Sequence, residues 1–395
     1  MHVDMNSYFA TAEQQANPHL RGRPVGIVKA AGRGCVIAAS VEAKKFGVKT
    51  GTTVWEARRL CPQIILVPSD MDKYFSLTEG LIRVIADYSP KMEIFSIDEM
   101  FLDVSDSQKC FGGGALEIAL EIKRRIMTEL GEWMRASVGI SFTKLLAKLA
   151  SEMHKPDGLT WLTPEDYLAR TAKTAVSEVC GIGHARTAWL SARGAYTLGA
   201  ARALPDVPPE IAELVWLRIA EPLTTADELE PAKSVGRTFT TFAEVEDQGG
   251  VEMLVRNLIE EACSKLREMG MAGRTFWLSL SVAQLHSLSV EKFWARKTID
   301  TPTNDPLVVF NLLWREYTKS PLPSVRFAGV GVSNLIHNSQ FSIFKRRQEL
   351  LRAADKVNER WGLFTLYPAS LLGGELIRPE VTGYLGDKWY RFGKH

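Results

Sequence analysis

Cysteine is sparse in this sequence, and its spacing excludes two common kinds of stabilising site. The five cysteines form no CxxC pair and no cluster with histidine, because they stand apart at Cys35, Cys61, Cys110, Cys180 and Cys263. Such scattering argues against a zinc site and against a disulfide framework. We therefore expect a protein of a reducing, intracellular compartment.

Long apolar runs are also missing. No segment approaches the roughly 18 apolar residues that a membrane-spanning helix requires. The chain opens with His2-Val3-Asp4 in place of a basic and then apolar leader. These absences predict a soluble, cytoplasmic protein without a membrane partner.

A large excess of charge of one sign is absent as well. The 48 basic residues face 46 acidic residues, for a net charge of +2. Affinity for nucleic acid would therefore have to come from local basic patches. Apolar residues are plentiful, at 46% of a 395-residue chain, which is enough for about two to four domains.

The apolar pattern predicts two mixed α/β modules with a helical module between them. In the first module we expect strands at 2–5, 34–39 and 135–141, a hairpin at 91–104, and helices at 10–16, 41–46, 114–130 and 143–153. The order hairpin, helix, strand, helix suits a ferredoxin-like layer. In the last module we expect strands at 235–242, 277–282, 293–299 and 325–334, helices at 250–269 and 306–317, and then a helix at 346–361.

Three acidic side chains are candidates for one site. Asp4 ends the first strand, while Asp98 and Glu99 lie in the hairpin that would be its neighbour. Consecutive residues of a regular strand point to opposite faces, so Asp98 and Glu99 can converge only if the turn at 96–98 is irregular. Converging carboxylates would suit Mg²⁺, which prefers oxygen ligands. Without convergence, the pair would merely decorate a solvated hairpin.

Longer motifs around these acids resemble a known family. HVDMNSYFATAE, SIDEMFLDV and SVGISFTKLLAKLASEMHKPDG resemble the three core motifs of Y-family DNA polymerases, in the family's order and spacing. GIG at 181–183, SVGRTFTTF and VRFAGVGVSNL are similar to its DNA polymerase IV (DinB) branch. The resemblance covers Met1 to Leu335 and implies an α+β multidomain, right-hand polymerase fold.

The resemblance also implies a domain plan. We expect a ferredoxin-like palm at 1–9 and 70–162, small fingers at 10–69, a helix-hairpin-helix thumb at 163–227, a linker at 228–234, a four-stranded little finger at 235–335, and a C-terminal tail at 336–395. Such a protein would be a template-directed DNA polymerase for low-fidelity translesion synthesis, without a proofreading exonuclease. We expect a monomer associated with the nucleoid.

By the same resemblance, the catalytic residues Asp4, Asp98 and Glu99 hold two Mg²⁺ ions, with the backbone carbonyl of Met5 as a further ligand. Mn²⁺ would be an acceptable substitute. The two metals would serve transfer of a nucleotide from dNTP to the primer 3′-hydroxyl. Phe9 matches the steric gate that excludes ribonucleotides, and Tyr8 is its aromatic neighbour.

The expected triphosphate contacts are Lys155, in HKPDG, and Lys44. Here the chain departs from the polymerase IV pattern, which places a Tyr and an Arg where this chain has Val41 and Lys44, and a hydroxyl residue where it has Ala38. The segment GCVIAASVEAKKFGVKTG instead resembles the catalytic subunit of DNA polymerase V. Replacing an Arg fork with a Lys point charge predicts a raised KM for nucleotide.

Expected macromolecular partners are primer–template DNA and a sliding clamp. Backbone N–H groups at Gly181 and Gly183 would contact a DNA phosphate. In the last module, Arg237, Lys292, Arg296, Lys297 and Arg326 could follow the duplex backbone. A short apolar peptide at Gln340, Phe341, Ile343 and Phe344 resembles clamp-binding peptides, or it is an ordinary amphipathic start to the last helix.

Two other classes of function stay open at this point. A catalytically weak Y-family adaptor that binds clamp or DNA would require the changes at Val41 and Lys44 to abolish nucleotide binding. A nucleotidyl cyclase shares a palm-like sheet with paired metal carboxylates, but it has no use for the GIG segment or the last module. Primer extension with Mg²⁺ separates the first alternative from a polymerase, and DNA binding separates the second.

Overall fold

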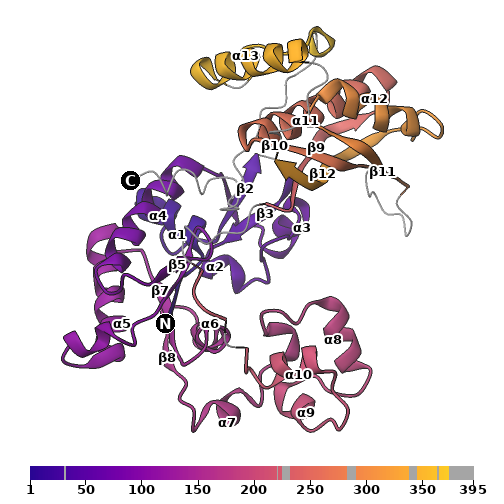
Figure 1. The fold of residues 1–395 in the computed structure, drawn as a ribbon. Coiled ribbons are helices and arrows are strands. Elements are labelled where there is room, and N and C mark those ends of the chain that lie inside the picture. Colours follow the sequence, from indigo (N-terminus) through magenta and orange to yellow (C-terminus); the bar gives the residue numbers. More distant parts are fainter. Residues whose placement is uncertain are drawn as a thin grey trace. The chain divides into compact units, whose positions relative to one another are not determined.

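The computed structural model describes residues 1–30, 33–219, 221–224, 232–282, 291–337, 345–362 and 364–372. The chain forms two compact units, one built on Met1–Leu229 and the other on Glu230–Glu380 (Figure 1). None of the described helices is long and apolar enough to cross a membrane.

A five-stranded sheet is the centre of the first unit. Its strand order is β5-β6-β1-β7-β8, with β1 (His2–Met5) paired antiparallel to both β6 (Glu99–Leu102) and β7 (Ala136–Ile140). The outer strands are β5 (Met92–Ile94) and β8 (Leu159–Trp161), and the associated helices are α4 (Met71–Ala86), α5 (Gly114–Arg125) and α6 (Lys144–Met153). This is the ferredoxin-like layer that the sequence predicts.

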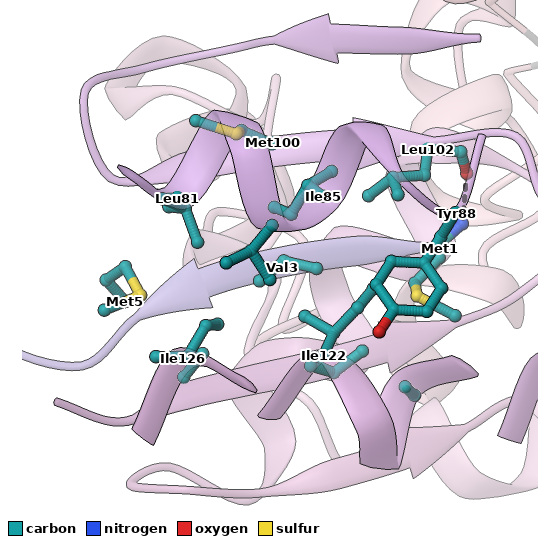
Figure 2. Close-up of a cluster of buried hydrophobic side chains, with 14 of the residues drawn as sticks. Met1, Val3, Met5, Leu81, Ile85, Tyr88, Met100, Leu102, Ile122 and Ile126 are labelled. Atoms are coloured by element: carbon teal, nitrogen blue, oxygen red, sulfur yellow. Dashed lines mark hydrogen bonds between the residues drawn. The ribbon is translucent and has the colours of Figure 1, made fainter. Parts of the chain in front are cut away.

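The two faces of this sheet differ in chemistry because side chains alternate along a strand. Val3 and Met5 of β1 point into an apolar core with side chains of α4 and α5, such as Ile85 and Ile122 (Figure 2). His2 and Asp4 therefore point to the opposite face. Helix α6 lies against that face.

Close approach of α6 to β7 depends on Gly139. A Cβ atom at Gly139 would lie 2.0 Å from the carbonyl oxygen of Ala147 and 2.5 Å from the Ser151 nitrogen. Only a residue without a side chain permits this approach. Its consequence is that Ser151 and Lys148 of α6 come within reach of β1 and β6.

A small three-stranded sheet follows β1 in the chain. Its order is β3-β2-β4, with β2 (Val25–Ala30) antiparallel to β3 (Arg33–Ala39) and parallel to β4 (Ile65–Pro68). The helices around it are α1 (Tyr8–Ala16), α2 (Val41–Lys44) and α3 (Val54–Leu60). Ser40 caps α2 by accepting a hydrogen bond from the Ala43 N–H.

Short helices make up the rest of the first unit. They are α7 (Tyr167–Thr171), the 3₁₀ turn η4 (Val176–Glu178), α8 (His184–Ser191), α9 (Leu198–Arg202) and α10 (Pro209–Val215). Their apolar side chains share a core with Leu146 and Leu149 of α6. Gly181 and Gly183 lie between η4 and α8, as the helix-hairpin-helix pattern predicts.

The second unit is a four-stranded sheet of order β11-β10-β12-β9. Its strands are β9 (Ser234–Val245), β10 (Met271–Ser281), β11 (Lys292–Thr303) and β12 (Val325–His337), and helices α11 (Gln248–Glu268) and α12 (Pro306–Tyr317) pack on one face. Helix α13 (Lys345–Trp361) joins this unit through ion pairs, Asp355 to Arg267 of α11 at 2.6 Å and Arg347 to Asp305 before α12.

Most predicted elements are present, with shifted ends. Helix α1 begins at Tyr8 and not at residue 10, while α2 ends at Lys44 and not at residue 46. The helix predicted over 114–130 is α-helical only to Arg125 and continues as a π-type turn, Ile126–Leu130. The strands of the second unit are longer than predicted: β10 begins at Met271 and not at residue 277, and β12 ends at His337 and not at residue 334.

Candidate active site

A pocket of about 200 Å³ lies between the end of β1, the start of α1 and the small sheet. It gathers most of the residues that the sequence proposes for metal and nucleotide, namely Asp4, Met5, Tyr8, Phe9, Lys44, Asp98 and Lys155. Ser7, Ile37, Ala38, Ala39 and Thr50 complete its lining. Residues far apart in the chain thus meet in one concave space.

Asp98 reaches this pocket because the chain bends over Ser96–Asp98, whereas Glu99 is not among the residues that line the pocket. Glu99 begins β6 and lies directly across from Asp4 of β1, and paired residues share one face of a sheet. Asp98 precedes the strand, where its carbonyl accepts the Met5 N–H at 2.9 Å and its carboxylate accepts the Ser96 hydroxyl at 2.5 Å. The irregular turn that convergence requires is therefore present.

Two of the acids, Asp4 and Asp98, ionise less readily than free carboxyl groups. Burial raises the pKa of Asp4 to about 7, although the charge of Lys155 opposes the shift. Burial also raises the pKa of Asp98. Such carboxylates gain from a nearby cation, and their hard oxygen atoms are the donors that Mg²⁺ prefers. The chemistry of this donor set therefore fits divalent cations.

Glu99 has the opposite behaviour. Burial would raise its pKa, but a hydrogen bond from His2 and the charge of Lys148 lower the pKa to about 2. Both partners contact the same oxygen, Oε2, with His2 Nε2 at 3.1 Å. Burial lowers the pKa of His2 itself to about 4, so its ring is a neutral partner near pH 7.

Lysine ammonium groups balance the acids in this structure. Lys155 Nζ lies 2.8 Å from Asp4 Oδ1, and Lys148 contacts Glu99. Across the described ranges, no group of three or more His, Cys, Asp or Glu side chains is arranged to enclose a metal ion. For Asp4, Asp98 and Glu99 to hold metal ions, their side chains would have to rearrange and Lys155 would have to leave Asp4.

The two predicted phosphate-binding lysines face the same pocket from different elements. Lys44 ends α2, and Lys155 follows α6. Partial desolvation lowers the pKa of the Lys44 amine, and the nearby charge of Lys155 adds to this effect. Two cations that repel each other across a small space are suited to a polyanion that would neutralise both.

Phe9 and Tyr8 have different environments. Tyr8 is buried, and its hydroxyl donates to the Tyr74 carbonyl at 2.7 Å, so this side chain joins α1 to α4. Phe9 is half-buried and borders the pocket. Its ring stacks on that of Tyr74, with centroids 4.3 Å apart. Phe9 therefore forms a supported, flat wall of the pocket.

Several neighbours of the site are absent from the sequence-based predictions. They are His2 and Lys148 beside Glu99, Tyr74 behind Phe9, and Ile37 and Thr50 in the pocket lining. His2 could have been found, since it precedes Asp4 by two residues and must share its face of β1. The others depend on contacts between distant segments.

Gly181 and Gly183 have different structural roles. Gly181 has a φ of +89°, and a Cβ atom there would lie 2.8 Å from Leu214. Gly183 precedes α8, where no side chain caps the helix, and a Cβ atom there would meet nothing within 4 Å. The first glycine is thus required by the turn, whereas the second leaves open space before the helix.

The basic residues of the second unit divide between its two faces. Arg237 of β9 and Lys297 of β11 turn toward the helices, where they pair with Glu261 at 3.7 Å and Glu316 at 3.2 Å. Lys292 and Arg296 of β11 are exposed on the side away from the helices.

Arg326, the remaining predicted contact, donates to the carbonyl of Thr241 and is only half-exposed. Exposed Trp294 and Phe242 add aromatic surface to this unit. The predicted clamp-binding residues Gln340, Phe341, Ile343 and Phe344 lie outside the described residues.

Comparison with known proteins identifies the family. Residues 3–152 match the model of the impB/mucB/samB family, and residues 232–344 match that family's C-terminal domain. DNA polymerase IV of Moorella thermoacetica is 34% identical over 385 residues, which span 94% of this chain and 95% of that protein. DNA polymerase IV of Pelotomaculum thermopropionicum is also 34% identical, over 94% of this chain and 97% of that protein.

Solved structures agree with this relationship. The Y-family DNA polymerase chimera Dbh-Dpo4(243-245)-Dbh superimposes with a TM-score of 0.68 over 85% of this chain and 99% of its own, at 24% identity, which supports the fold. DinB from Sulfolobus solfataricus gives a TM-score of 0.50 over 85% of this chain and 99% of its own, at 25% identity. The predicted right-hand fold class is confirmed, and the chain belongs to the Y-family DNA polymerases of the impB/mucB/samB family, in their DinB-like branch.

Proposed function

We propose that this protein is a template-directed DNA polymerase that performs low-fidelity translesion synthesis without a proofreading exonuclease. One observation carries the proposal: in a member of this family, two acids, two lysines and a flat aromatic ring border one pocket. These are Asp4, Asp98, Lys44, Lys155 and Phe9. Each has a separate task in joining a dNTP to a primer.

The acids would hold two Mg²⁺ ions, or Mn²⁺ in their place. Asp4, Asp98 and Glu99 supply carboxylate oxygens, and the Met5 carbonyl is a further candidate ligand. When bound, such ions activate the primer 3′-hydroxyl and neutralise the charge that grows on the phosphates. The chain's own contribution would be to hold Asp4 and Asp98 in position, since β1 and the bend at Ser96–Asp98 are both fixed by backbone hydrogen bonds.

The remaining pocket residues would select and orient the nucleotide. Lys155 would leave Asp4 and bind the triphosphate, and Lys44 would bind it from the side of the small sheet. Point charges neutralise phosphate without the bidentate geometry of arginine, so the nucleotide grip is weaker than with an arginine. The Phe9 ring would lie under the sugar and exclude a 2′-hydroxyl.

Primer–template DNA would be held by contacts that read no bases. The uncapped start of α8, beside Gly183, offers N–H groups to a phosphate. In the second unit, the exposed Lys292 and Arg296 are better placed for phosphates than Arg237 and Lys297, which pair with acids on the helix side. We also propose that the protein binds a sliding clamp, is a monomer and acts at the nucleoid.

One observation favours a second function, that of a catalytically weak adaptor. Lys155 and Lys148 already satisfy Asp4 and Glu99, so a chain that never admits metal would be electrostatically balanced. An adaptor would bind DNA without extending a primer. Its activity would not depend on Asp98.

Primer extension with Mg²⁺ distinguishes these functions. If the chain is a polymerase, we expect the unaltered chain to extend the primer. We expect Asp98→Asn and Glu99→Gln to lower kcat by orders of magnitude without changing the melting temperature. Asp106→Asn is a matched control, because Asp106 is an exposed acid near the same hairpin. Extension by Asp98→Asn at the rate of this control would remove Asp98 from the site, and no extension by the unaltered chain would favour the adaptor.

A further inference from the structure

A buried histidine lies next to the proposed metal site and has no assigned role. His2 is 0% exposed and belongs to the same face of β1 as Asp4. Its ring packs against Phe101, its cross-strand partner, at a centroid distance of 4.4 Å. Burying an imidazole costs free energy unless both ring nitrogens find partners.

Both nitrogens of this ring have partners from different elements. Nδ1 lies 2.8 Å from the Ser151 hydroxyl of α6, and Nε2 lies 3.1 Å from Glu99 Oε2 of β6. A neutral ring can donate to the Glu99 carboxylate only when its proton is on Nε2, so Nδ1 then accepts from Ser151. The Ser151 hydroxyl is also 2.7 Å from the Lys148 carbonyl, and rotation of this hydroxyl selects between the two acceptors.

The contact restrains one specific oxygen of Glu99. His2 and Lys148 both use Oε2, and the described residues show no hydrogen bond to Oε1. Lys148 is a flexible side chain that is 20% exposed, whereas His2 is fully enclosed by the sheet and α6. His2 is therefore the rigid partner of the two, and it leaves Oε1 available to a cation.

We propose that His2 is a positioning residue that orients the Glu99 carboxylate for metal binding. The proposal rests on the proposed polymerase function and deepens it. His2 is not among the residues that line the pocket. Its loss should therefore weaken metal binding and slow turnover while the KM for dNTP is retained, a split that general destabilisation would not produce.

Three substitutions test this role. His2→Phe keeps an aromatic ring against Phe101 but removes both nitrogens. His2→Gln carries a terminal N–H that can reach Glu99, whereas His2→Asn is one methylene shorter and cannot. The Asn variant keeps the test valid if the Phe variant fails to fold, and His19→Phe is a control because His19 is exposed.

Two measurements are needed. The first is Mn²⁺ binding, followed by electron paramagnetic resonance, to the protein with a dideoxy-terminated primer–template and dNTP. The second is the Mg²⁺ dependence of kcat. We expect His2→Phe and His2→Asn to weaken Mn²⁺ binding and to raise the Mg²⁺ requirement by about 10–100-fold, as loss of a residue that orients a metal ligand commonly does, with His2→Gln close to the unaltered chain.

Metal affinity in His2→Phe or His2→Asn that equals that of the unaltered chain would overturn the proposal. Equal losses in the Gln and Asn variants would also overturn it, because the N–H to Glu99 would then be irrelevant. If the unaltered chain extends no primer, the polymerase proposal fails. The Mn²⁺ comparison among variants still reports on His2 in that case.

Discussion

Phe9 and Tyr74 stack with their rings nearly parallel, at an interplanar angle of 12° and a centroid separation of 4.3 Å. The Tyr74 hydroxyl donates to Glu13 of α1 at 2.9 Å, and Glu13 also accepts from Lys73 at 2.8 Å. The ring behind Phe9 is thus held at its far end by a buried carboxylate. The Phe9 ring, supported in this way, could exclude the 2′-hydroxyl oxygen of a ribonucleotide by its position alone.

Replacing Phe9 with alanine should therefore relax the choice of sugar. We expect Phe9→Ala to raise the ratio of ribonucleotide to deoxyribonucleotide incorporation by about 10–200-fold, the range that one steric contact commonly provides. Single-nucleotide kinetics with paired rNTP and dNTP measure this ratio. Phe46→Ala, which removes an exposed phenylalanine just after α2, is the control. A similar ratio of ribonucleotide to deoxyribonucleotide incorporation in both variants would contradict the role of Phe9 as a steric gate.

Substitution of Lys44 should change the KM for nucleotide. We expect Lys44→Ala to raise the KM for dNTP by about 10–150-fold, because a charge-assisted phosphate contact contributes about 1.5–3 kcal/mol. Lys44→Arg should lower the KM below that of the unaltered chain, since a guanidinium can bind phosphate in a bidentate manner. Steady-state kinetics measure the KM for dNTP in both variants. Lys45→Ala is the control, because Lys45 is exposed. A KM that is the same in all variants would place Lys44 outside the nucleotide site.

The two glycines before α8 should respond differently to alanine. Gly181→Ala forces a side chain into a φ of +89° and toward Leu214, and we expect a loss of about 1–3 kcal/mol of stability. Gly183→Ala has open space and ordinary backbone angles, so stability should be kept while DNA affinity falls, because the methyl group obstructs the approach of a phosphate. Thermal melting and fluorescence anisotropy separate the two effects, and unchanged DNA binding by Gly183→Ala would exclude the predicted phosphate contact.

Glu260 of α11 should make the stability of the second unit depend on pH. Burial raises its pKa to about 7, with Asp305 and Asp355 adding to the shift and Arg267 and Arg347 opposing it. The folded state therefore keeps a proton that the unfolded chain releases near its ordinary pKa of 4.5. Stability should fall as pH rises from about 4.5 to 7, by about 3 kcal/mol at most.

Glu260→Gln should remove this dependence, because glutamine has the same shape and no charge to bury. We expect hydrogen exchange of the α11 amides to be slower in the variant than in the unaltered chain at pH 8, and similar at pH 5 after correction for intrinsic rates. Glu268→Gln is the control, since that acid pairs with Lys265 at the surface. Equal protection in all three proteins at pH 8 would contradict the prediction.

Sequence reasoning was most successful where a rule of strand geometry applied. Alternation of side chains requires a bend between Asp98 and Glu99, and the bend is present. The same rule bears on the second unit, where Arg237 lies between apolar Val235 and Phe239 at spacings of two. That spacing puts Arg237 on the helix side, where the structure has it beside Glu261.

Other features could not be predicted because they depend on contacts between distant segments. The pairing of Lys155 with Asp4 joins residues 151 positions apart, and the pairing of Lys148 with Glu99 needs α6 to lie on the sheet. That approach depends on the missing side chain of Gly139. The sequence shows Gly139, but it does not show that the backbone of α6 would clash with a side chain at this position.

The ion pair between Lys155 and Asp4 has a thermodynamic consequence for a polymerase. In the proposed function Lys155 would leave Asp4 to bind the triphosphate, because one ammonium group cannot neutralise both, and the Asp4 carboxylate would then be free for a divalent cation. Each ligand would thus favour binding of the other, and the two affinities would rise by the same factor. A nucleotide that arrives without a metal ion would have to break the ion pair of Lys155 with Asp4, and so would a metal ion that arrives without a nucleotide.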